Sequence, residues 1–423
     1  MKLTKKLLTF LVVLTAVAVY TTSCKKEEGC TDQSAVNYNE EAEDDDGSCI
    51  YDSGSDNVMV TQNITGEETW TSDNVYQLGG RITVESGATL TIEAGTIIKG
   101  EAGTGSNATA LLVARGATLM AEGRADAPII FTSVADEIMP SDIASGDFRS
   151  PNLDPDINGL WGGVIILGNA RISASNSSGD VSEVQIEGIP TSDPNGLYGG
   201  ADDADNSGVI KYISIRHGGA NIGAGNEING LTMGGVGTGT VIEHIEVVAN
   251  QDDGFEWFGG SVDVSNIVTW NAGDDGLDTD QSWSGTVDNW FVITAGDHCM
   301  ELDGPEGTYE ASHTMQNGTI IASSGSAESN TLINMDANTG VNLTNIAILN
   351  VVPGQIINRV ECDGIPGGCP FTNVQVQVPS GSTLEDILDG ATAPAGITSA
   401  ASPTTGADNS ALGWTWAAQA GAL

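Results

Sequence analysis

Three acidic clusters recur in the same frame near the middle of the chain. They read NQDDGFEWFGG from residue 250, GDDGLDTDQSW from residue 273 and GDHCMELDGPEG from residue 296. Equivalent positions are 22 and then 23 residues apart, with short aliphatic runs and Gly- and Asn-rich turns between them, which is typical of a solenoid. The repeat predicts an all-β fold, a right-handed parallel β-helix whose coils stack about 4.8 Å apart.

The repeat also predicts which side chains point into the β-helix. Two aligned columns are apolar and are expected to stack inside: Ile245, Ile267, Trp290, and Phe255, Leu277, Met300. Because side chains alternate along a strand, the acidic residues next to the second column should point outward. The following column, which contains Trp257, should point inward again.

Strand-like sequence with a period of two extends over residues 75–378, and its length predicts roughly ten to twelve coils. Segments 133–160 and 173–208 interrupt the pattern and are rich in Asp, Ser, Pro and Gly, so they are expected to be surface loops. The Ala- and Ser-rich segment 379–423 is expected to cap the open end, with Trp414 and Trp416 in a final strand.

The N-terminus is typical of an export signal. Residues 1–23 begin with lysines and continue into a short apolar run, and TTSC, ending at Cys24, resembles a bacterial lipobox. We therefore expect lipidation of Cys24, a tether over residues 24–28, and an outer-membrane lipoprotein held by acyl chains. The charged sequence CKKEEG resembles tails that direct Bacteroidota lipoproteins to the cell surface.

Export to an oxidising compartment allows disulfides. Cys30 and Cys49 flank a small module, residues 29–51, and Cys362 and Cys369 flank a Gly/Pro turn, so two local disulfides are predicted. Cys299 is left over and is expected to be a buried thiol. The module reads GCTDQSAVNYNEEAEDDDGSCIY, resembles a short module of secreted Bacteroidota proteins, and precedes a predicted linker at residues 52–74.

The charge balance narrows the range of partners. The chain has 57 Asp and Glu against 14 Lys and Arg, a net charge of −43. Nucleic acid is excluded as an expected partner, because binding phosphate requires clustered basic residues. Divalent cations or cationic partners suit this surface, although solubility alone also accounts for the charge.

Stacking would bring the acidic residues of successive coils together. Like charges at rung spacing raise one another's pKa, so bound cations, protons or water must offset the repulsion. A Ca²⁺ site is the first interpretation, because hard cations prefer several converging oxygens. Its candidate ligands are Asp253, Glu256, Asp275, Asp278, Asp280, Glu301 and Asp303.

Two other interpretations remain open for the same residues. Asp275, Asp278 and His298 could form a catalytic centre, since paired carboxylates can act as general acid and base in glycoside cleavage. GDD resembles the paired Asp of polygalacturonases, but no Gly-His-Gly or Arg-Ile-Lys follows, and only Arg216 and His217 are candidates for a lyase base. The third interpretation is a solvated acidic face without a ligand.

Several sequences resemble a family of Bacteroidota β-helix surface lipoproteins without an established activity: GLWGGVIILGNA, NEINGLTMGGVGTGTVIEHIEVV and DDGFEWFGG. The resemblance implies the fold and a surface location. The expected function is binding of extracellular polysaccharide or another surface component through a Ca²⁺-linked acidic face with an aromatic rim. The alternative is a carbohydrate-active enzyme, either a polysaccharide lyase or a glycoside hydrolase.

Overall fold

The computed structural model describes residues 26, 28–31, 38–39, 41–45, 47–48, 57–222, 228–360 and 370–423. The chain divides into two units, Met1–Ser53 and Gly54–Leu423. In the small unit, β1 (Glu28–Gly29) pairs in parallel with β2 (Asp44–Asp45). Cys24, Cys49, Cys362 and Cys369 lie outside the described residues, so the lipid anchor and both disulfides stay predictions. Within the described ranges, no helix has the length and apolarity needed to cross a membrane.

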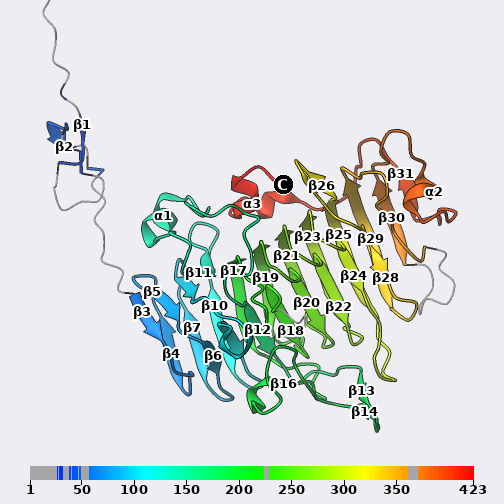
Figure 1. The fold of residues 1–423 in the computed structure, drawn as a ribbon, viewed down its shortest axis with the longest axis horizontal. Helices are drawn as coiled ribbons and strands as arrows, with labels where there is room; N and C mark the ends of the chain where they lie inside the picture. The colour runs from blue at the N-terminus through cyan, green and yellow to red at the C-terminus, as the bar shows by residue number, and fades with distance from the viewer. Residues whose placement is uncertain are drawn as a thin grey trace, which may run out of the picture. The chain divides into compact units, whose positions relative to one another are not determined.

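The large unit is a right-handed parallel β-helix, which confirms the predicted fold (Figure 1). One long side of it is an eight-stranded sheet in which every neighbouring pair is parallel. Its strands, in spatial order, are β6 (Arg81–Val84), β9 (Ala110–Val113), β12 (Val164–Leu167), β18 (Leu231–Gly234), β20 (Phe255–Phe258), β22 (Leu277–Asp280), β24 (Met300–Leu302) and β28 (Asn334–Met335).

The other two sides belong to one bent fifteen-stranded sheet. In the first coils, separate strands form each side: β4 (Glu67–Trp70), β7 (Thr89–Ile92) and β10 (Thr118–Glu122) on one, and β3 (Asn57–Val60), β5 (Val75–Leu78), β8 (Ile97–Gly100) and β11 (Ile129–Ser133) on the other. β17 (Gly208–Arg216) then pairs with β10 through its first half and with β11 through its second half. From β17 onward, single strands span both sides.

These later strands continue the sheet rung by rung: β19 (Val241–Val248), β21 (Val264–Trp270), β23 (Thr286–Ile293), β25 (His313–Ile321), β29 (Val341–Leu349), β30 (Phe371–Val376) and β31 (Ile397–Ser399). The predicted columns are confirmed. Phe255 is in register with Leu277 and Leu277 with Met300, and Ile245, Ile267 and Trp290 align in the same way. All six are fully buried, and burying each such side chain contributes about 1.5–3 kcal/mol.

An asparagine ladder marks the bend of the long strands. Five asparagines occupy the left-handed region there, with φ between 53° and 61°: Asn266, Asn289, Asn317, Asn345 and Asn373. Asn tolerates this conformation better than other non-glycine residues. Their side chains also bond from rung to rung, with Asn289 Nδ2 donating to Asn266 Oδ1 at 2.8 Å and Asn345 Nδ2 to Asn317 Oδ1 at 3.0 Å. This ladder was not predicted, although its signal is visible in the sequence as an Asn directly before the inward residues Ile267 and Trp290.

The β-helix begins earlier than the sequence predicted. β3 and β4 lie in the predicted linker, yet β3 pairs with β5 and β4 with β7. Trp70 is fully buried and stacks on Tyr76 with ring centroids 4.9 Å apart. This first coil was not predicted, because the sequence between the two strands is polar and rich in turns.

The segment 379–423, predicted to cap the β-helix, covers its end only with its first part, and residues 400–423, the C-terminal segment, lie elsewhere. Trp416 begins the short helix α3 (Trp416–Gln419), and the segment runs back across the outside of the bent sheet (Figure 1, red). It contacts Gln375, then Asn289 and then Glu246 through hydrogen bonds. The reason is that the covered strands point apolar side chains outward there, including Phe291 and Ile293.

The end of the β-helix is covered by α2 (Leu384–Ile387). Ile387 and Leu388 are buried against the interior core, and Ile357 N donates a hydrogen bond to Ile387 O. The remaining short elements are β26 (Ser323–Ser324), β27 (Ala327–Glu328), and the 3₁₀ turns Gly105–Asn107, Pro194–Gly196 and Asn409–Ala411.

The two predicted surface loops cover different sides. Loop 133–160 contains α1 (Pro140–Ser145) and packs Ile143 and Phe148 against Ile97 and Ile130 on the bent sheet. Loop 173–208 contains β13 (Ala174–Asn176), β14 (Gly179–Val181), β15 (Val184–Gln185) and β16 (Leu197–Tyr198). It packs Ile186 and Tyr198 on the outer face of the eight-stranded sheet.

Candidate functional site

The outer face of the eight-stranded sheet changes from apolar to acidic along one column. Neighbouring strands place seven outward residues in register: Leu112, Ile165, Thr232, Glu256, Asp278, Glu301 and Asn334. The first two are buried beneath loop 173–208, and the acidic residues begin at β20. We call the acidic face the set Asp253, Glu256, Asp275, Asp278, Asp280, His298, Glu301 and Asp303.

The acidic face contains groups of ligand atoms close enough to share a cation. Asp253, Glu256 and Asp278 each place one oxygen within 4.8 Å of the others. Asp275, His298 and Glu301 form a second group at the same spacing, and Asp252, Asp253 and Asp274 a third. Five of the seven predicted metal ligands therefore converge, whereas Asp280 and Asp303 belong to none of these groups.

Part of this arrangement is structural. Asp253 Oδ1 accepts a hydrogen bond from Asp275 N at 2.9 Å, and Asp275 Oδ1 accepts one from His298 N at 2.7 Å. The His298 ring adds a contact from Nδ1 to Asp275 Oδ1 at 2.9 Å. One oxygen of each Asp therefore joins successive coils.

Burial and crowding keep protons on this face. Burial, reinforced by neighbouring carboxylates, raises the pKa of Asp253, Glu256 and Asp278 well above the usual range. Three more carboxyls are raised mainly by burial: the pKa of Glu301 to about 8, of Asp280 to about 7 and of Asp303 to about 6. The hydrogen bond to Asp275 raises the pKa of His298 to about 9.

Two buried oxygens on this face have no hydrogen-bond partner among the described residues, Asp278 Oδ1 and Asn229 Oδ1. Asn229 lies beside Glu256, to which its amide nitrogen donates. Across the described part of the chain, no Lys or Arg forms an ion pair with a carboxylate of the acidic face. An unpartnered buried carboxylate oxygen is costly, so a cation or a proton would stabilise it.

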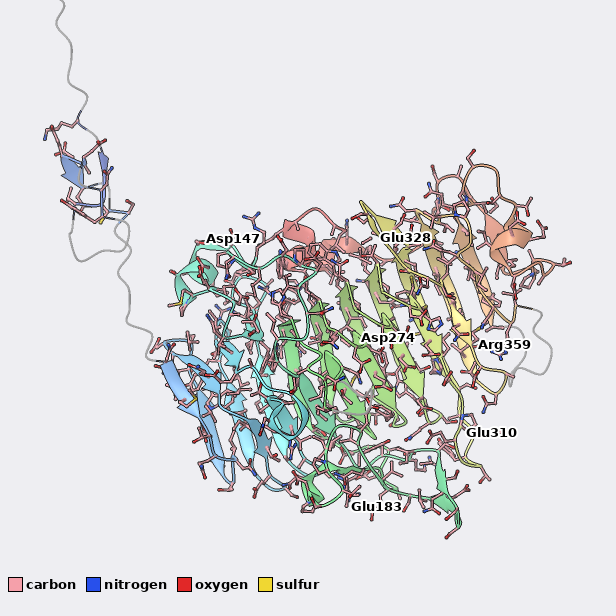
Figure 2. The ribbon with its side chains drawn as sticks, in the orientation of Figure 1. Asp147, Glu183, Asp274, Glu310, Glu328 and Arg359 are labelled. Carbon is pink, nitrogen blue, oxygen red and sulfur yellow. The ribbon has the colours of Figure 1, made fainter. Side chains whose placement is uncertain are left out.

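One edge of the acidic face is walled by loops. Tyr198 Oη donates to Gln281 Oε1 at 2.9 Å, and Gln281 Nε2 donates to Glu306 Oε2 at 2.9 Å. These bonds join loop 173–208 to the turn after β24. In Figure 2, Glu183 and Glu310 mark the loops along the lower edge and Asp274 lies among the strands.

The prediction that aromatic side chains form a rim around the acidic face is wrong. Trp257, Trp283 and Trp290 are buried in the core, because they point into the β-helix. Trp270 is partly exposed but lies on the bent sheet. The inward positions predicted for Trp257 and Trp290 are confirmed.

Arg216 and His217 do not serve the acidic face either. Arg216 ends β17 in the bent sheet and His217 follows it, and both are buried beneath the C-terminal segment. Cys299 is a free, fully buried thiol, as predicted, and burial raises its pKa to about 12. A thiol that stays protonated at neutral pH is not a nucleophile.

Comparison with known families gives the chain its place. A family model described as a pectate-lyase-like β-helix domain matches residues 62–146 and 150–420. The chain belongs to this family. No curated protein and no solved structure matches the chain. The pectate-lyase-like match spans every residue of the acidic face, and it also includes β4 of the first coil, which lies in the predicted linker.

Proposed function

We propose that this protein is a cell-surface lipoprotein whose acidic face binds Ca²⁺ and, through Ca²⁺, a carboxylate-bearing extracellular polysaccharide. The observation that carries the proposal is the convergence of Asp253, Glu256 and Asp278, together with an Asp278 Oδ1 that has no hydrogen-bond partner among the described residues. Membership of a pectate-lyase-like family is compatible with a protein that binds or acts on polysaccharide. The lipobox-like ending at Cys24 supports the surface location.

Asp253, Glu256 and Asp278 are the first candidates for Ca²⁺ ligands. They offer only oxygen donors, and Ca²⁺ takes six to eight oxygens in flexible geometry. Three protein ligands leave coordination positions open, which a uronate carboxylate and water can fill. The Asp275, His298 and Glu301 group suits Ca²⁺ less, because the pKa of His298 is raised to about 9 and its ring holds a proton.

The alternative is catalysis by the second group. His298 Nδ1 lies 2.9 Å from Asp275 Oδ1 and 3.9 Å from Glu301 Oε2. The raised pKa of Glu301, about 8, keeps this carboxyl protonated at neutral pH, as a general acid requires. This group is the specific reason to retain a glycoside hydrolase or lyase as the second candidate.

The test is thermal unfolding of the full chain carrying Cys24→Ser, first in EDTA and then in millimolar Ca²⁺. Binding to the folded state should raise stability by about 2.7 kcal/mol when Ca²⁺ is at a hundredfold excess over Kd. Asp278→Asn should remove this gain, whereas Asp73→Asn, an exposed Asp on an early turn, should retain it. An unchanged melting temperature in Ca²⁺ would eliminate the metal, and uronate oligomers should then be tested for cleavage.

A further inference from the structure

A cavity of about 610 Å³ lies on the bent sheet, away from the sheet that carries the acidic face. Three segments distant in sequence form its walls: loop 133–160, the end of β21 and the C-terminal segment. The residues on which its chemistry depends are Asp142, Asp147, Arg149, Asp154, Trp270 and Trp416.

Hydrogen bonds hold the walls together. Gln419 Oε1 accepts from Phe148 N and Gln419 Nε2 donates to Gly146 O, both at 2.9 Å, so α3 is fastened to the loop. Asn271 Nδ2 donates to Pro155 O at 2.9 Å on the opposite side. The cavity is therefore preformed, which lowers the entropic cost of binding a ligand.

Trp416 is fixed from several directions. The Arg216 guanidinium lies over its ring at 5.0 Å, the His217 ring contacts it edge-on at 5.6 Å, and Trp270 meets it edge-on at 6.0 Å. Arg216 is 1% exposed, its Nε donates to Ser214 Oγ at 2.8 Å, and its two terminal nitrogens have no hydrogen-bond partner among the described residues. This support leaves Trp270, which is partly exposed, as the aromatic surface offered to a ligand.

The polar groups around Trp270 point to the class of ligand. An aromatic ring can stack on the C–H face of a sugar, and carboxylates and guanidinium groups hydrogen-bond its hydroxyls. Arg149 is already paired with Asp147 through two contacts of 2.8 Å, so its charge is neutralised. Asp142 and Asp154 add negative charge, which would repel a uronate carboxylate.

We propose that this cavity binds a neutral sugar unit by stacking it on Trp270. The inference does not rest on the proposed function, because the acidic face lies on a different sheet and would recognise negative charge through a cation. Together, the two sites would suit a polysaccharide that contains both neutral and acidic units.

The test is isothermal titration calorimetry of the full chain carrying Cys24→Ser, in EDTA so that no divalent ion is bound. The probes are maltotriose, cellotriose, mannotriose and xylotriose, with trigalacturonate as the charged comparison. We expect saturable binding of at least one neutral trisaccharide and weaker binding of trigalacturonate. Trp270→Ala should weaken that binding at least tenfold, whereas Trp270→Phe, which keeps an aromatic ring, should change it less than threefold.

Asp154→Asn provides a second variant that leaves the tryptophan packing intact, because Asp154 is exposed at the rim. It should weaken the neutral sugar and strengthen trigalacturonate. The proposal is overturned if no neutral trisaccharide binds, if Trp270→Ala binds as tightly as the parent, or if trigalacturonate binds best. If Asp278→Asn abolishes binding of the neutral sugar, the sugar binds at the acidic face and the proposal is wrong. The effect of Ca²⁺ on unfolding tests the acidic face alone and does not bear on this cavity.

Discussion

Asp278 lies between two other acidic side chains, Glu256 on one neighbouring strand and Glu301 on the other. Such a stack is unfavourable unless protons or cations are bound, because burial weakens the screening of like charges. Substitution of Asp278 therefore tests whether protons or cations compensate the negative charge of this column.

Asp278→Asn should have opposite effects in the two metal states. In EDTA it should stabilise the protein by about 1 kcal/mol, because asparagine is neutral without taking up a proton and so avoids the cost of placing a carboxyl group in a repelling column. In Ca²⁺ it should leave the protein less stable than the parent, because a ligand is lost. Urea unfolding in each condition measures both values, with Asp73→Asn as the control; a loss of stability in both states would show that Asp278 is only structural.

The raised carboxyl pKa values predict a specific pH dependence. Asp303, Asp280 and Glu301 have folded-state pKa values of about 6, 7 and 8, above their ordinary values. The folded protein therefore binds more protons than the unfolded chain, and its stability in EDTA should fall as pH rises from about 5 to 9. Saturating Ca²⁺ should reduce this slope. Unfolding free energies at pH 5, 7 and 9 test it, and a rise in stability with pH in EDTA would contradict the assignment.

The residue columns could be predicted because the repeat of 22 and 23 residues is nearly constant, which fixes register and therefore the direction of each side chain. The two roles of Asp275, as a link between coils and as a candidate ligand, could not be predicted. Whether one of its oxygens accepts a hydrogen bond from the His298 N–H depends on the backbone direction at the turn, which cannot be read from the repeat pattern.

The asparagine ladder is the feature of the strands that most limits substitution. Asn317 has φ 53°, donates to Asp288 Oδ1 at 2.7 Å and accepts from Asn345. Its neighbours in the ladder are a rung away on either side, so each bond joins successive coils. The ladder therefore couples coils outside the apolar core.

Asn317→Ala should destabilise the protein by about 2 kcal/mol, because alanine lacks the polar side chain that helps asparagine adopt the left-handed region and because two side-chain hydrogen bonds are lost. Asn317→Gly should cost less, since glycine adopts this conformation freely and only the hydrogen bonds are lost. Thermal unfolding of the pair separates the two contributions. Equal losses for Ala and Gly would mean that backbone conformation contributes nothing at the bend.

At the scale of elements, the sequence predicted that segments 133–160 and 173–208 are loops but not which side each covers. Their apolar residues, such as Ile143 and Ile186, are too sparse to show a period. Their placement depends on outward apolar residues on distant strands, such as Ile97 and Ile165. Only the three-dimensional stacking brings these partners together.

For the whole molecule, the C-terminal segment acts as a lateral cover over many coils. Its contacts extend from Gln375 through Asn289 and Glu246 to Phe148, which lie in very different parts of the chain. The end cap predicted for residues 379–423 was right only for α2. Residues 400–423 run along the side instead, because Phe291 and other outward apolar residues gather there.

Deletion of residues 401–423 should expose this side while leaving the stacked coils in place. We expect strong binding of the dye ANS and a tendency to associate, with strand content by circular dichroism largely kept, because the interior core is separate from the covered surface. The parent chain is the control. Complete loss of strand structure would show that the segment is needed for the coils themselves.

The path of this segment also sets the order in which parts of the molecule can fold. Residues 401–423 close a surface formed by strands and loops that precede them by up to about 270 residues, as the hydrogen bond from Gln419 to Gly146 shows. A growing chain can stack its coils one after another, but the outer side of the early coils stays uncovered until residues 401–423 have been synthesised. If the chain is exported as its N-terminus predicts, this delay suits a protein that must cross a membrane before it becomes fully folded.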